Sequence, residues 1–313
     1  MLELKGPLFF PVTPFTKMGA IDAGGLSDHI AQRIDDGAAC VFAACGTGEF
    51  HALSGAEHRQ VTAVAVAAAA GRVPVIVGAG GSVAAASEQL HSAEREGADG
   101  ILLLPPYLVA SPQAGLVQYV RTIAAASGLP IIVYQRGVMT LTPDSAVQIA
   151  QIPNVIGLKD GVGDIGLMQC IVIAIRNSGP SDFMFFNGVA TAEVTMKPYR
   201  AIGVPLYSSA VFTFAPDLSM AFHDALEAND EPLIDILLHE FFIPFTGIRD
   251  RELGYQISLV KSAVPELMRS GGVRAPLVET SAAAQTDLQN LLARARASLN
   301  TFLGSKLPES SGS

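Results

Sequence analysis

The sequence has no tryptophan and only three cysteines, Cys40, Cys45 and Cys170. These cysteines form neither a disulfide framework nor a paired CxxC metal site, and an odd count is typical of proteins in a reducing compartment. We therefore interpret the thiols as small buried hydrophobic groups. The six histidines are scattered, and His51 and His58 have no third ligand at a metal-binding spacing. We predict no metal site.

Positive charge is also scarce. Lysine and arginine number 20 against 29 aspartates and glutamates, which gives a net charge of −9, and no basic run occurs. Nucleic acid is therefore a poor candidate partner, and an anionic substrate would need hydrogen-bond donors supplied locally.

The sequence also lacks long apolar runs. None reaches the ~20 residues of a membrane span. The start "MLELKGPLFFPVTPF" lacks the basic region and cleavage site of a signal peptide. We expect a cytoplasmic protein without a membrane partner.

Half of the residues are nevertheless hydrophobic, and they gather in eight short runs separated by segments with helical periodicity. The runs begin at Pro7, Ala39, Val73, Gly100, Leu129, Asn154, Asp182 and Gly203. Fully apolar strands alternating with helices are typical of a parallel sheet, and eight such units predict an α/β protein of the (β/α)8 TIM barrel class. We expect the barrel to occupy residues 1–215 and to close near Ser209.

Two helices of the barrel are predicted over Gly55–Ala70 and Val83–Glu96, and Ser54 and Glu57 have the spacing of a capping box. Residues 216–300 carry no comparable strand-like run, so we predict a C-terminal helical region packed on the barrel or on a partner subunit. Its predicted helices are Asp217–Ala228, Glu231–Phe242, Leu253–Met268 and Ala282–Leu299. We expect the tail, residues 301–313, to be disordered.

The catalytic face of such a barrel lies at the C-terminal ends of its strands. Lys159 ends the sixth apolar run, where burial would lower its pKa and make the amine nucleophilic. Tyr134 ends the fifth run and would lie beside Lys159, in position to relay protons. A lysine that extends to the rim and a tyrosine that packs in the core are the structural alternatives.

The loop "CGTGEF" after the second run offers main-chain N–H groups from Gly46, Thr47 and Gly48, together with a hydroxyl, which suit a carboxylate. A turn that only needs flexible glycines is the alternative. The segment "GAGGS" is similar to a phosphate loop, but Val83 stands where the nucleotide fingerprint needs glycine. We predict no nucleotide cofactor.

Four motifs, "GTGEF", "PPYL", "YQR" and "GLKDGVGD", fall in order at the second, fourth, fifth and sixth strands. In this arrangement the chain resembles the dihydrodipicolinate synthase and N-acetylneuraminate lyase superfamily, whose members are Schiff-base barrels. The segments "KDGVGDIGLM", "NGVATAE" and "YSSAVFTFAP" are most similar to the 5-dehydro-4-deoxyglucarate dehydratases. Leu108 stands where the synthases usually carry a second tyrosine, and Gly46 stands where they carry a hydroxyl residue.

The resemblance implies a decarboxylating dehydratase that acts on a keto sugar diacid through a lysine Schiff base, without cofactor and as a homo-oligomer, with a tetramer favoured. It implies Lys159 as the imine lysine, Tyr134 as the proton relay, and Gly46 and Thr47 as the keto-carboxylate site. The further substrate-binding candidates are Arg136, Asn187, Ser208 and Ser209. A pyruvate-releasing aldolase of the same superfamily and a non-catalytic keto-acid sensor are the alternatives.

Overall fold

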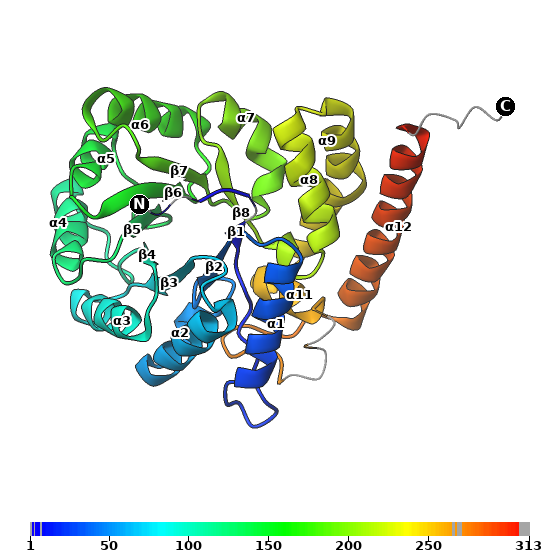
Figure 1. The fold of residues 1–313 in the computed structure, drawn as a ribbon, viewed down its shortest axis with the longest axis horizontal. Coiled ribbons are helices and arrows are strands. Elements are labelled where there is room, and N and C mark those ends of the chain that lie inside the picture. The colour runs from blue at the N-terminus through cyan, green and yellow to red at the C-terminus, as the bar shows by residue number, and fades with distance from the viewer. Residues whose placement is uncertain (1, 3, 7, 265–266, 268–270, 307–313) are drawn as a thin grey trace.

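The computed structural model describes residues 2, 4–6, 8–264, 267 and 271–306. Eight parallel strands close into a barrel in sequence order, because β8 pairs with β1 (Figure 1). The predicted barrel class is confirmed. The strands are β1 (Leu8–Phe9), β2 (Cys40–Ala43), β3 (Val75–Ala79), β4 (Gly100–Leu103), β5 (Ile131–Gln135), β6 (Val155–Asp160), β7 (Met184–Asn187) and β8 (Leu206–Ser209).

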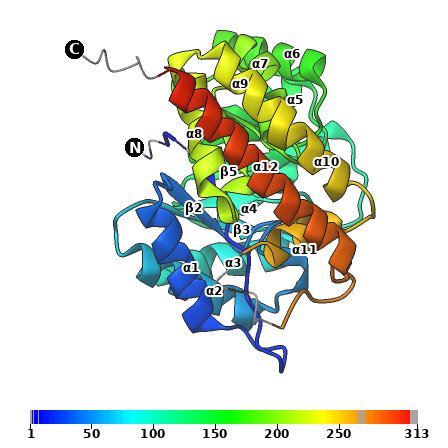
Figure 2. The same ribbon diagram turned by 90° about the vertical axis from the view of Figure 1, so that its right-hand side faces the viewer.

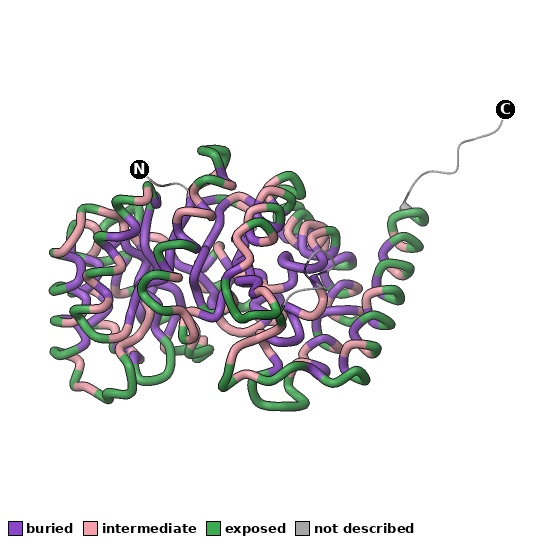
Figure 3. Tube along the Cα trace, turned by 90° about the horizontal axis from the view of Figure 1, so that it is seen from below, coloured by how far each residue is buried: buried purple, intermediate pink, exposed green. Residues whose placement is uncertain are grey.

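Alternate residues of each strand point to opposite sides of the barrel wall. One set, with Phe10, Phe42, Ile76 and Phe186, fills the barrel interior. The other set packs outward against the surrounding helices, so buried residues form the centre and exposed ones the outer helical faces (Figure 3). Both faces of the strands are thus buried, which is why the sequence shows continuous apolar runs.

Five of the helices around the barrel begin at a residue whose side chain caps the first turn, namely Asp22, Ser54, Ser82, Thr142 and Asp164. Helix α2 begins with the predicted capping box, in which Ser54 accepts from Glu57 N and the Glu57 side chain accepts from Ser54 N. The surrounding helices are α1 (Ala23–Asp35), α2 (Gly55–Ala69), α3 (Val83–Glu96), α4 (Gln113–Ala124), α5 (Pro143–Ala150), α6 (Ile165–Ser178), α7 (Met196–Ala201) and α8 (Pro216–Ala228).

The predicted C-terminal region begins at residue 216 and so includes α8, but in the structure α8 follows β8 as the eighth helix around the barrel. The region after α8 is helical. It comprises α9 (Glu231–Leu237), the π-helical segment η4 (Leu238–Phe242), α10 (Ile243–Arg249), α11 (Tyr255–Ser262) and α12 (Ala282–Lys306). The π turn comes just before Pro244, which lacks an N–H and would clash with the carbonyl group one α-turn earlier. The predicted helix over Leu253–Met268 is shorter at both ends among the described residues, and part of that range lies outside them.

Helix α12 packs across α9, η4 and α10 on the outer side of the molecule (Figure 2). It continues to Lys306, so the predicted disorder of residues 301–306 is wrong. Phe302 packs against the core and extends the apolar face of the helix by a further turn. Residues 307–313, the remainder of the predicted tail, lie outside the described residues.

Two further predictions can be compared with the structure. Cys40 and Cys45 are buried as predicted, but Cys170 is exposed, because it lies on the solvent side of α6. Within the described part of the chain, no helix combines the length and apolar character needed to cross a membrane.

Candidate functional site

A pocket lies at the C-terminal ends of the barrel strands and contains most of the predicted site residues. It is lined by Phe10, Gly46, Thr47, Leu102, Tyr134, Arg136, Lys159, Gly188, Val189, Ala190, Thr191, Ser208, Ala210 and Gln256. Phe10 and Leu102 are apolar side chains of the barrel interior, so the floor of the pocket has a low polarity.

Lys159 lies within this pocket and is only 5% exposed, so it does not extend to the solvent at the rim. Its Nζ atom is 4.0 Å from the centre of the Tyr134 ring and 4.7 Å from that of Phe10. Burial lowers the pKa of Lys159, and the nearby positive charge of Arg136 lowers it further, although Tyr134 and Cys45 act in the opposite direction. The amine is therefore more readily deprotonated, and more nucleophilic, than an exposed lysine.

Tyr134 is paired in register with Lys159 on the neighbouring strand, as predicted. Its hydroxyl donates to Gly188 O at 2.8 Å and accepts from Arg136 Nη1 at 3.1 Å. Burial acts to raise the pKa of the phenol, but the charges of Lys159 and Arg136 and the Arg136 hydrogen bond outweigh it, so the pKa is lowered. A phenol with a lowered pKa beside a buried amine can exchange protons with a bound molecule.

Two glycines leave room for this pair. A Cβ atom at Gly188 would lie 2.6 Å from Lys159 Cγ, and one at Gly161 would lie 2.7 Å from the Tyr134 hydroxyl oxygen. Both distances are below van der Waals contact. Neither glycine was predicted as a site residue, although both fall in the motifs "GLKDGVGD" and "NGVATAE".

Asp160 follows Lys159 and points away from the barrel axis, as strand alternation requires. Its buried carboxylate accepts from Gln135 Nε2 at 2.8 Å, from Val162 N at 3.0 Å and from the Tyr199 hydroxyl. These bonds tie the end of β6 to β5, to α7 and to the following loop. The main chain that carries Lys159 is thereby fixed.

The loop after β2 borders the same pocket through Gly46 and Thr47. Thr13, in the segment after β1, lies behind this loop and does not line the pocket. Its hydroxyl donates to Gly48 O at 2.7 Å and so supports the loop. Arg136 and Ser208 line the pocket as expected of substrate-binding candidates.

The predicted substrate contacts of Asn187 and Ser209 require correction. Both side chains are fully buried outside the pocket, since strand alternation directs their neighbours Phe186 and Ser208 toward the barrel axis. Asn187 Nδ2 donates to Ala192 O at 3.1 Å and to Thr195 Oγ1 at 2.8 Å. Ser209 Oγ donates to Glu193 Oε1 at 2.5 Å. Their role is to hold the segment after β7.

Two contributions to the pocket were missed by the sequence analysis. The run Gly188–Thr191 follows β7 within the motif "NGVATAE", in which Asn187 is the one predicted site residue. Gln256 belongs to α11 and reaches the pocket from the C-terminal region, and no sequence pattern indicated it. Among the described residues, no group of three or more His, Cys, Asp and Glu side chains could hold a metal ion.

The family model of the dihydrodipicolinate synthetase family matches residues 3–295. The chain belongs to this family. A protein of Streptomyces griseus named "Probable 5-dehydro-4-deoxyglucarate dehydratase" is 50% identical over 299 residues, which cover 95% of this chain and 93% of the relative. A protein of Acinetobacter baumannii with the same name is 39% identical over 299 residues, covering 93% and 97% of the two chains.

Solved structures of this family have the same fold. Dihydrodipicolinate synthase from Oceanobacillus iheyensis superposes with a TM-score of 0.84 at 27% identity, covering 93% of this chain and 96% of the synthase. The chloride-inhibited dihydrodipicolinate synthase of Acinetobacter baumannii, solved in complex with pyruvate, gives a TM-score of 0.80 at 28% identity, with 94% and 99% covered.

Proposed function

We propose that this protein is a lyase that converts 5-dehydro-4-deoxy-D-glucarate into 2,5-dioxopentanoate, carbon dioxide and water through an imine on Lys159. The observation that carries the proposal is the buried amine of Lys159, with its lowered pKa, beside the Tyr134 hydroxyl. The names of relatives that are 39% to 50% identical support the choice of substrate.

The reaction begins when the neutral Lys159 amine attacks the C5 ketone and water leaves, which forms an imine. The protonated imine acidifies C4, and loss of a C4 proton gives an enamine that expels the C3 hydroxyl as water. In the resulting conjugated iminium, the electron pair from the bond between C1 and C2 moves into the conjugated system as carbon dioxide leaves. Protonation at C4, tautomerisation of the C2 enol to an aldehyde, and hydrolysis then release the product and regenerate the amine.

In this mechanism the Tyr134 hydroxyl relays protons, since it lies beside Lys159 and is linked to Arg136. Gly46 and Thr47 hold the carboxylate next to the ketone. Arg136 and Ser208, which also line the pocket, supply donors to the remainder of the diacid. These local donors are required because the overall charge of −9 does not attract an anionic substrate.

We further propose that the protein is a cytoplasmic homo-oligomer, with a tetramer favoured. The loop residues Tyr107, Leu108 and Val109 support an oligomer, because they are 74%, 77% and 61% exposed and place apolar surface on the catalytic side of the barrel. The free thiols, two of them buried, agree with a reducing compartment.

The test is proton NMR of the purified protein with 5-dehydro-4-deoxy-D-glucarate, with carbon dioxide followed in parallel. We expect equal amounts of 2,5-dioxopentanoate and carbon dioxide. The variant Lys159→Met keeps the side-chain length without the amine, and we expect it to fold and to be inactive. Turnover by the folded variant would refute the imine mechanism. Pyruvate among the products would instead indicate the aldolase.

Reductive trapping with borohydride checks which lysine forms the imine. The protein has a second buried lysine, Lys261, whose Nζ lies 2.7 Å from Glu49 Oε1. Burial lowers the pKa of Lys261 as well, although Glu49 acts in the opposite direction, so the two lysines differ in position and not in the direction of the shift. Because Lys261 does not line the pocket and its amine is held by Glu49, we expect the trapped adduct on Lys159 alone. An adduct that maps to Lys261 would contradict the assignment.

A further inference from the structure

The loop that borders the pocket ends in a fully buried acid, Glu49, two residues after Thr47. Glu49 has a left-handed main-chain conformation with φ of +57°, which is uncommon for residues other than glycine. Its Oε1 atom accepts from Lys261 Nζ at 2.7 Å, and its Oε2 atom accepts from the main-chain N–H of Arg274 at 2.9 Å. Both donors belong to the C-terminal region, more than 200 positions away in the chain.

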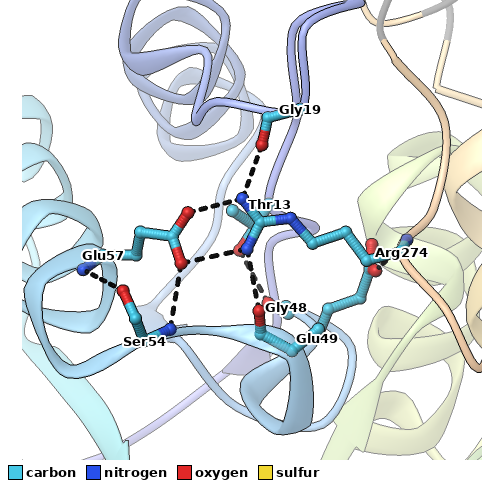
Figure 4. Close-up of polar contacts among 8 residues, drawn as sticks. Thr13, Gly19, Gly48, Glu49, Ser54, Glu57 and Arg274 are labelled. Carbon is cyan, nitrogen blue, oxygen red and sulfur yellow. Dashed lines mark hydrogen bonds and ion pairs between the residues drawn. The ribbon is translucent and has the colours of Figure 1, made fainter.

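The Arg274 side chain binds the surroundings of the same loop (Figure 4). Its guanidinium group donates to both carboxylate oxygens of Glu57 in the first turn of α2. It also donates to Ala52 O at 2.8 Å and to Gly19 O at 2.6 Å. One arginine from the C-terminal region therefore connects the end of the loop, the start of α2 and the segment after β1.

A single aromatic ring lies under both cations of this arrangement. Lys261 Nζ is 4.1 Å and Arg274 Cζ is 4.0 Å from the centre of the Phe15 ring. On the barrel side, the Thr13 hydroxyl holds Gly48 O at 2.7 Å. The loop with Gly46 and Thr47 is thus held on one side by the segment after β1 and on the other by the C-terminal region.

Stability alone does not explain a buried ion pair at this place. Taking two charges out of water is costly, and replacing a buried pair with apolar residues of similar volume is often neutral or stabilising. Backbone conformations that are rarely populated gather where a loop must present groups to a ligand. Here both features occur at Glu49, two residues after the pocket-lining Thr47.

We propose that Glu49, held by Lys261 and by the main chain of Arg274, is the positioning residue that fixes Gly46 and Thr47 for the keto carboxylate. This inference rests on the proposed function. It makes the C-terminal region part of the binding site, since Lys261 is carried by α11, the helix that also supplies Gln256 to the pocket.

The test uses the full chain, pyruvate as the probe and borohydride trapping followed by mass spectrometry. The double variant Glu49→Gln/Lys261→Met removes both charges without leaving one unpaired. We expect the double variant to fold. The pyruvate concentration for half-maximal trapping should rise about tenfold, while the trapping rate at saturating pyruvate should stay within about twofold of wild type. The reason is that the loop binds the carboxylate and not the reacting carbon.

The matched control is Arg296→Met. Arg296 Nε lies 2.7 Å from Asp217 Oδ2, so this variant also breaks an ion pair, but one that joins α12 to α8, and neither helix contributes a residue to the pocket. We expect wild-type half-saturation for it. If the double variant does not fold, Glu49→Asp keeps the charge on a shorter side chain that tolerates the left-handed conformation, and it should also raise the half-saturation concentration several-fold.

The outcomes separate the two proposals. A folded double variant, or a folded Glu49→Asp variant, with wild-type half-saturation overturns the positioning role and leaves the imine mechanism in place. A wild-type protein that is not trapped by pyruvate or by the diacid overturns the proposed function, and the positioning role with it.

Discussion

The substitution Gly188→Ala tests whether the position of the Lys159 side chain controls activity. The added Cβ would lie 2.6 Å from Lys159 Cγ, 2.8 Å from its Cε and 2.9 Å from Asp160 O. Carbon atoms in contact normally lie ~3.5–4.0 Å apart, so the lysine or the main chain must move by about 1 Å. Because Asp160 fixes the end of β6 with several hydrogen bonds, most of the movement falls on the lysine stem and on the segment after β7.

A displacement of about 1 Å at a reacting group costs ~10²-fold in rate. We therefore expect Gly188→Ala to lower kcat about 100-fold, and to slow trapping at saturating pyruvate by a similar factor. Overpacking typically costs ~1–3 kcal/mol of stability, so the protein should still fold, with a lower midpoint in urea.

The control for this experiment is Gly247→Ala in α10, where the added Cβ meets no atom within 4 Å. We expect wild-type rates and unchanged or slightly higher stability, because alanine favours helix over glycine by up to ~1 kcal/mol. A folded Gly188→Ala protein with wild-type kcat and wild-type trapping would refute the reasoning.

Two further predictions concern the groups around this site. Tyr134→Phe should lower kcat ~10²-fold and change KM little if the hydroxyl relays protons, whereas an unchanged rate in the NMR assay would assign the phenol to packing. Burial raises the pKa of the Glu193 carboxyl from 4.5 to about 7, so the folded protein holds this proton more tightly than the unfolded chain does. The free energy of unfolding should therefore fall as the pH rises from 4.5 to about 7. The loss should be on the order of 3 kcal/mol in urea unfolding. Glu193→Gln should remove this dependence of the unfolding free energy on pH. An equal dependence in the variant would show that another group causes it.

The strands could be predicted because a parallel strand between two layers is apolar on both faces and so forms a recognisable run. The capping box of α2 was equally local, since Ser54 and Glu57 contact each other within one turn. The end of α12 was not predicted, because the packing of Phe302 against the core outweighs the weak local signal of a polar terminus.

The candidate site was predictable in part for a similar reason. Lys159 and Tyr134 were identified because neighbouring strands place their ends together. Asn187 and Ser209 were assigned incorrectly, because a strand of four residues does not reveal from its sequence which alternate side faces the axis. Only the packed barrel decides that Phe186 and Ser208 point inward.

The sequence by itself determined the order of strands and helices, the lysine at the end of β6 and the glycine-rich loop after β2, since each depends on residues close together in the chain. Tertiary structure decided what surrounds them. The closeness of Gly188 to the lysine stem, the position of Gln256 at the pocket and the ion pair between Glu49 and Lys261 join distant segments. Contacts of this kind depend on how the barrel closes and on how the C-terminal helices pack against it, and no local pattern of residues records them.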